Sequence, residues 1–212
     1  ELGGKDALIV LDDANVEQAA HAAINGAFIA AGQNCLAAER VLVHDHVYDA
    51  FVGRVTEIAR QLRQGAPLEA PGQVDVGALV TAQQLDIVDG LVQDAISRGA
   101  RALVGGRKGA SGGNFYEPTV LVDCTTDMRI MNEETFGPIM VISRVKNDEE
   151  AIRVANSTDY ALSLTVMGAD GARAKAVADR ITSGSCSIND FGFTYMVQDL
   201  PFGGERGSGF GR

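Results

Sequence analysis

The chain has 212 residues, of which 46% are apolar and 22% charged, and this length suits one well-buried domain rather than two large ones. Its net charge is −10 and its 18 basic residues are scattered, which argues against nucleic acid or an anionic membrane surface as a partner. No apolar run approaches the roughly 18 residues of a membrane-spanning helix, and no leader opens the chain, so neither a membrane segment nor secretion is expected.

The predicted elements alternate between strand and helix. In chain order they are a strand over 7–11, a helix over 16–31, a strand over 40–44, helices over 48–62 and 81–98, a strand over 101–104, an extended segment over 115–122, a strand over 140–145, a helix over 148–156, a strand over 163–167, a helix over 172–181 and a strand over 185–189. Asp13 or Asn15 can cap the first helix, and Gly32 is expected to end it. This order predicts an α/β fold with a mostly parallel, twisted sheet covered by helices.

Cysteine and histidine usage bears on the compartment and on metal binding. The three cysteines, Cys35, Cys124 and Cys186, are an odd and widely spaced set, which fits neither a disulfide framework nor a metal site. A reducing cytoplasm is therefore expected. His44 and His46 could contact a metal ion, but no third ligand is near them in the sequence, so no metal site is predicted.

Two glycine-rich stretches raise the question of a bound nucleotide. The segment 105–113 follows a strand, but it lacks the spacing of a phosphate-binding loop and no helix pattern follows, so a flexible surface connection is expected. The glycines of 203–211 close the chain without a following helix. No dinucleotide fingerprint is recognisable, so a cofactor would need another domain to hold most of it.

Cys35 stands just beyond the first predicted helix, in the segment Gly32-Gln33-Asn34-Cys35. A lone cysteine is usually a small buried apolar residue rather than a catalytic thiol. Its context is more specific, because Cys35 belongs to one of five short motifs along the chain: 1–5 (ELGGK), 32–35 (GQNC), 133–138 (EETFGP), 201–204 (PFGG) and 208–212 (SGFGR). In these motifs and in their order, the chain resembles the NAD(P)-dependent aldehyde dehydrogenase superfamily over its entire length.

The resemblance implies a role for each matched residue at the reaction centre and the cofactor. Cys35 resembles the thiol nucleophile, and Glu1 resembles the general base that activates the hydrolytic water. Glu134 resembles the carboxylate that binds the nicotinamide ribose hydroxyls, and Phe136 resembles the aromatic residue that packs near that ribose. Two further residues of the opening motif are expected at the cofactor, Leu2 and Gly3.

Aldehyde binding is expected in the segment that begins at Asn189. In the family, the corresponding loop lines the aldehyde tunnel, so residues 191–198 would shape the choice of substrate. An apolar lining could come from Phe191, Phe193, Tyr195 and Met196. Alternatively, some of these side chains simply pack beneath the loop.

The resemblance also implies the chemistry. A thiolate adds to the aldehyde, hydride leaves to NAD or NADP, and the resulting thioester is hydrolysed by water that a carboxylate deprotonates. Cys35 has no basic neighbour in sequence, so its activation must come from backbone N–H groups or from residues that the fold places nearby. Residues 1–212 are interpreted as the catalytic domain, without the upstream cofactor-binding domain and the C-terminal tail. The full-length protein is expected to be a homo-oligomer that acts on a small-molecule aldehyde.

Two other functions remain open at this stage. A CoA-acylating relative would pass the thioester to CoA and would need no water-activating carboxylate, so the presence of Glu1 argues against it. The chain could also be a non-catalytic folded or oligomerisation fragment, because alone it would lack most of the cofactor site. In that case the isolated chain is expected to be inactive as a dehydrogenase.

Overall fold

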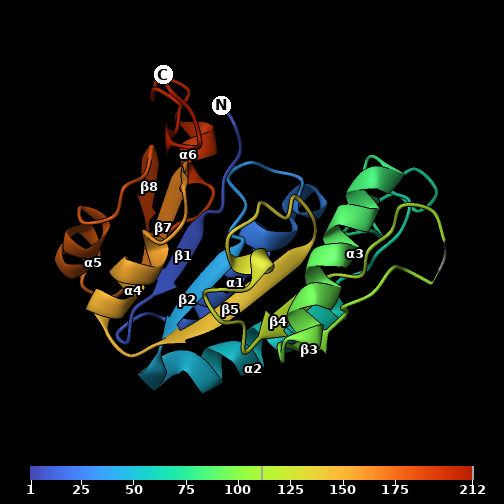
Figure 1. The fold of residues 1–212 in the computed structure, drawn as a ribbon, viewed down its shortest axis with the longest axis horizontal. Helices are drawn as coiled ribbons and strands as arrows, with labels where there is room; N and C mark the ends of the chain where they lie inside the picture. The colour runs from blue at the N-terminus through green and yellow to red at the C-terminus, as the bar shows by residue number, and fades with distance from the viewer. Residues whose placement is uncertain (111, 212) are drawn as a thin grey trace.

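The computed structural model describes residues 1–110 and 112–211; Ser111 of the glycine-rich connection and Arg212 of the closing motif lie outside the described residues. Its centre is a seven-stranded sheet in the order β3-β4-β5-β2-β1-β7-β8 (Figure 1). The strands are β1 (Ala7–Val10), β2 (Arg40–His44), β3 (Arg101–Val104), β4 (Thr119–Val122), β5 (Ile139–Val145), β7 (Ser163–Met167) and β8 (Ser185–Ile188). Only β3, at one edge, pairs antiparallel among these strands. The predicted α/β fold with a mostly parallel sheet is confirmed.

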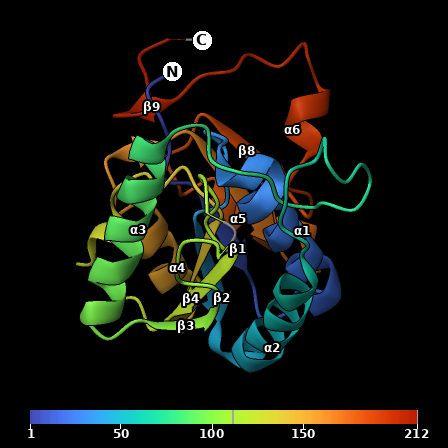
Figure 2. The same ribbon diagram turned by 90° about the vertical axis from the view of Figure 1, so that its right-hand side faces the viewer.

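Helices cover both faces of this sheet (Figures 1 and 2). Helices α1 (Val16–Phe28) and α2 (Asp45–Gln61) bury one face, while α3 (Ala82–Ser97), α4 (Asp148–Ala155) and α5 (Gly171–Ala178) bury the other. None of the described helices has both the length and the apolar character needed to cross a membrane.

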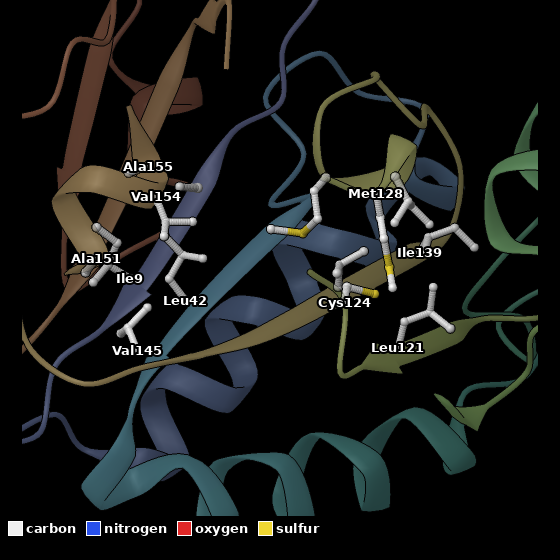
Figure 3. Packing of buried hydrophobic residues seen from close by; sticks show 14 of the residues in the cluster. Ile9, Leu42, Leu121, Cys124, Met128, Ile139, Val145, Ala151, Val154 and Ala155 are labelled. Atoms are coloured by element: carbon white, nitrogen blue, oxygen red, sulfur yellow. The ribbon is translucent and has the colours of Figure 1, made fainter. Parts of the chain in front are cut away.

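The central strands are buried on both faces, which is why β1 is a continuous apolar run and β2 has three consecutive apolar residues between Arg40 and His44. In β1, Leu8 and Val10 pack toward α1 and α2, whereas Ile9 packs toward α4. Figure 3 shows Ile9 and Leu42 against Val154 of α4 in the second of these layers. Each strand end is therefore fixed by packing on two sides, and the loops that leave the strands start from rigid positions.

The first helix ends earlier than predicted. Helix α1 begins after Asn15, whose side chain accepts a hydrogen bond from the Gln18 N–H at 3.1 Å, but it stops at Phe28. A 3₁₀ segment (η1, Ile29–Gly32) follows, in which Ala30 and Ala31 adopt left-handed φ values of 51° and 57°. This tight turn, rather than Gly32 alone, carries the chain out of the helix toward Cys35.

Other boundaries shift by a few residues, and short elements appear that periodicity does not reveal. Helix α2 starts at Asp45 instead of 48, because the His44 side chain accepts a hydrogen bond from the His46 N–H. Of the extended segment 115–122, only Thr119–Val122 is a strand. The unpredicted elements are η2 (Arg129–Met131), α6 (Phe193–Met196) and a small sheet of β6 (Tyr160–Ala161) and β9 (Glu205–Arg206).

Candidate active site

Three segments that are far apart in sequence meet before the amino end of β1. The first is the segment 1–6, which leads into β1. Here the Gly3 N–H donates to the Glu1 carboxylate at 2.7 Å, and the Gly4 N–H donates to Glu134 Oε1 at 2.9 Å. A Cβ on Gly3, where φ is 97°, would lie 2.8 Å from Glu134 Oε2. The left-handed backbone at Gly3 favours glycine, and the missing side chain leaves room for the Glu134 carboxylate beside it.

The second segment is the loop that carries Cys35. A Cβ on Gly4 would lie 2.5 Å from the Cys35 carbonyl oxygen, so the two backbones touch. Asn34 orients this loop, because its Oδ1 accepts the Leu36 N–H at 3.1 Å and its Nδ2 donates to the Tyr195 hydroxyl. Cys35 is half-buried and forms no disulfide.

The third segment carries Glu134 and Phe136, and a buried ion pair fixes it. Lys5 Nζ lies 2.5 Å from Glu39 Oε2 and donates to Thr135 Oγ1 at 2.8 Å. Glu39 Oε1 in turn accepts the N–H groups of Thr135 and Phe136 at 3.0 and 2.8 Å. Lys5 comes from the first segment and Glu39 from the strand entry just after Cys35, so one charge pair links all three segments.

A cavity of about 280 Å³ opens beside the Cys35 thiol. Most of its remaining lining comes from the segment around and after α6, and the complete lining is Cys35, Leu36, Ser185, Thr194, Tyr195, Val197, Gln198, Leu200, Pro201 and Phe202. None of these described lining residues is charged. Such a pocket suits an uncharged organic group held against a thiol.

The expected aldehyde-binding residues occupy different environments. Tyr195 lines the cavity. Phe191 is buried against Gly26 of α1, Phe193 is 60% exposed, and neither is in the lining. Asn189 holds the loop instead, since its side-chain amide exchanges two 2.8 Å hydrogen bonds with the Gly168 backbone. Leu200 and Phe202 line the cavity but were not anticipated, because their apolar character alone does not distinguish lining from packing.

The charges around Cys35 oppose its ionisation. Burial is the main cause that raises the pKa of its thiol, and the carboxylates of Glu1 and Asp6 raise that pKa further. Burial also raises the pKa of Glu134. A catalytic thiolate at this position therefore depends on stabilisation that appears only with substrate bound, such as backbone N–H groups facing a developing oxyanion.

Asp6 lies buried behind the site, and one of its carboxyl oxygens, Oδ2, has no hydrogen-bond partner among the described residues. Burial raises its pKa well above the usual value. A raised folded-state pKa gives stability that is fully present below the unfolded pKa and is lost as pH rises toward the folded pKa. The wild type should lose this stability from about pH 4 upward.

Asp6→Asn is therefore expected to gain stability relative to the wild type by about 1.4 kcal/mol per pH unit above about pH 4, until the folded pKa is reached. Urea unfolding at several values between about pH 5 and pH 8 measures the difference. The exposed Asp199→Asn variant is the matched control and should follow the wild type. If the free energy of unfolding changed with pH in the same way for the wild type and for Asp6→Asn, this account of Asp6 would be contradicted.

The fold and the site together define a class: an α/β domain that presents a half-buried thiol, flanked by two carboxylates, to an uncharged cavity. The sequence model of the Aldehyde dehydrogenase family matches residues 1–212. The chain therefore belongs to the aldehyde dehydrogenase family.

Individual relatives agree with this assignment. The chain is 41% identical to a succinate-semialdehyde dehydrogenase [NADP(+)] of Deinococcus radiodurans, with all of this chain and 44% of that protein covered. It is also 41% identical to a betaine aldehyde dehydrogenase of Cereibacter sphaeroides, again over all of this chain and over 43% of that protein. The crystal structure of betaine aldehyde dehydrogenase from Staphylococcus aureus in complex with NAD+ superimposes with a TM-score of 0.94 at 34% identity, covering 100% of this chain and 42% of that one. The chain thus spans less than half the length of these relatives.

Proposed function

We propose that the full-length protein oxidises an aldehyde to a carboxylic acid with NAD+ or NADP+, and that residues 1–212 form its catalytic domain. The observation that carries this proposal is the position of the Cys35 thiol, which lines the cavity while the Glu1 and Glu134 carboxylates act on it electrostatically. A thiol beside a carboxylate suits acyl transfer to water.

In the proposed reaction, the Cys35 thiolate adds to the aldehyde carbon and forms a thiohemiacetal. The cofactor, when bound, supplies the acceptor for the hydride that leaves this carbon. A thioester on Cys35 remains. Glu1 then takes a proton from water, the resulting hydroxide attacks the thioester carbon, and the acid leaves as the Cys35 sulfur departs.

Cofactor contacts are proposed for Glu134, Phe136, Leu2 and Gly3. Glu134 fits a ribose diol, because Oε1 is held by the Gly4 N–H while Oε2 faces Gly3, where a side chain would block the approach. Phe136 has a left-handed φ of 48° and is fixed by the Glu39 carboxylate at its N–H. These residues hold only the nicotinamide end.

The substrate proposed for this cavity is an uncharged aldehyde that contacts Tyr195. The described lining offers no cation to pair with a carboxylate substrate, and its side chains are apolar or uncharged polar groups. The roles proposed for Asn189, Phe191 and Phe193 are indirect, since their side chains support the loop or the core instead of lining the cavity. A cytoplasmic, homo-oligomeric protein is also proposed, and the absence of disulfides among Cys35, Cys124 and Cys186 supports that compartment.

Replacing the proposed base tests the reaction. In the full-length protein, Glu1→Gln should still release about one equivalent of NAD(P)H per site in a burst, whereas steady-state turnover should fall by about 10²- to 10⁴-fold. Quenched samples should carry an acyl group on Cys35 by mass spectrometry. Unchanged steady-state turnover would remove Glu1 from the mechanism. Acyl-CoA as the wild-type product whenever CoA is added would support the CoA-acylating alternative instead.

A further inference from the structure

Three side chains with metal-binding atoms meet at the carboxyl ends of β1 and β2. Cys35 lies beyond the opposite, amino ends of these strands. Strands β1 and β2 are parallel neighbours with Val10 beside Val43. Asp12 follows β1, and His44 ends β2 before His46 in the first turn of α2. One ligand atom from each of the three lies within 4.8 Å of the others. We propose that Asp12, His44 and His46 bind a divalent transition-metal ion, and that Zn2+ matches this donor set best.

The two histidines have ring nitrogens available. His44 is only 8% exposed, and in the described part of the chain its ring has one hydrogen bond, a long contact of 3.4 Å from the His46 N–H. The His46 ring is 78% exposed, with Nδ1 3.8 Å from Asp12 Oδ2. Tetrahedral zinc needs neighbouring ligand atoms roughly 3.3 Å apart, so the three ligand atoms, which lie within 4.8 Å of one another, must move closer together to bind it, and the exposed His46 ring has room to rotate.

Asp12 is oriented for this role by Arg173. The Arg173 guanidinium binds Asp12 Oδ1 at 2.5 Å, and Asp12 Oδ2 faces His46. A partner that orients a ligand in this way is common around protein metal sites.

The local charge also favours a cation. Three carboxylates surround Arg173, because Asp13 and Asp148 join Asp12 around the one guanidinium. Oδ1 of Asp13 is buried and has no hydrogen-bond partner among the described residues. The excess of negative charge outweighs the roughly half positive charge at the amino end of α2, which faces the same edge. Three protein ligands leave a coordination position for water or an exchangeable group.

Titration of the purified chain with Co2+ and Zn2+ tests the site. We expect one equivalent of Co2+ to give visible d–d bands without thiolate charge transfer, and Zn2+ to displace it. At a hundredfold excess over its Kd, Zn2+ should raise Tm by about 5 °C. His44→Ala and His46→Ala should each weaken binding by at least about tenfold. Two variants serve as controls and should bind like the wild type. They are His21→Ala, which removes the one histidine outside the proposed site, and Cys35→Ser.

The exposed His46 keeps the test decisive if His44→Ala fails to fold. Wild-type affinity in the His46→Ala variant would overturn the proposal. So would loss of binding in Cys35→Ser, because the metal would then occupy the thiol site. These outcomes are independent of the proposed dehydrogenase activity, since no aldehyde or cofactor is present.

Discussion

Lys5→Met is expected to lower the free energy of unfolding by about 3–5 kcal/mol, because it leaves the Glu39 carboxylate buried without its ammonium partner. Both side chains of the pair are almost completely inaccessible to solvent. Burial lowers the pKa of Lys5, while the Glu39 carboxylate opposes that shift. Chemical denaturation followed by circular dichroism measures the loss.

A double-mutant cycle separates this pair from general damage to the core. Lys5→Met combined with Glu39→Leu should be more stable than the sum of the two single losses predicts, because neither charge is then left unpaired. The exposed pair Arg63 and Asp75 is the control, and breaking it should have a much smaller effect. Equal losses for the buried and exposed pairs would contradict the role given to Lys5 and Glu39.

The pair should also matter for the proposed reaction. Glu39 holds the N–H groups of Thr135 and Phe136, so Glu39→Gln in the full-length protein is expected to raise KM for NAD(P)+ more than it lowers kcat. The Cys35 loop keeps its own contacts to Tyr195 and Gly4 in this variant. An effect confined to kcat would instead indicate that Glu39 acts in the chemical step and does not serve mainly to position Glu134 and Phe136 for the cofactor.

Gly32→Ala is expected to cost about 2–5 kcal/mol and to displace the Cys35 loop. Gly32 has a φ of 69°, a left-handed conformation that costs an alanine about 1–2 kcal/mol. A Cβ at this position would also overlap the Gly137 carbonyl group, and such overpacking typically costs about 1–3 kcal/mol. The contact joins the Cys35 loop to the loop of Glu134 and Phe136, so its loss separates two parts of the site.

Gly53→Ala provides the matched comparison. Gly53 lies inside α2, and a Cβ there would meet nothing within 4 Å. This exchange should stabilise the protein by about 0.5–1 kcal/mol, because alanine loses less backbone entropy in a helix. Thermal unfolding of the two variants measures the contrast, and a stable Gly32→Ala protein would refute the tight packing of the two loops.

The sequence predicts those parts of the fold that local periodicity determines. Strands β1 and β2 and helices α1 to α5 coincide with predicted elements, with boundaries that shift by a few residues. The early end of α1 could not be predicted, because alanine favours helix and nothing local marks Ala30 and Ala31 as left-handed. The close contact of Gly32 with Gly137, which is more than a hundred residues away in sequence, accompanies that turn.

The candidate site also has features that the sequence predicts and features that only the structure reveals. Ordered motifs identified the family, and the structure brings their segments 1–5, 32–35 and 133–138 together. The pairing of Lys5 with Glu39 was not anticipated, because no pattern links two charges 34 residues apart. Phe191 and Tyr195 are both aromatic residues of one loop, yet only the fold separates the buried ring from the one that lines the cavity. Asp12 likewise joins His44 and His46 only through the adjacency of β1 and β2.

Acylation of the purified chain by p-nitrophenyl acetate tests the central claim most directly, because acyl transfer to a thiol needs no cofactor. The account predicts a single acetyl group, mapped to Cys35 by peptide mass spectrometry, that Cys35→Ala abolishes and Cys186→Ala leaves intact. Burial raises the pKa of both thiols, that of Cys186 to about 11, so the selectivity expected for Cys35 comes from the cavity that holds the ester against its sulfur. An acetyl group on Cys186, or undiminished labelling of the Cys35→Ala variant, would contradict the assignment of Cys35 as the nucleophile.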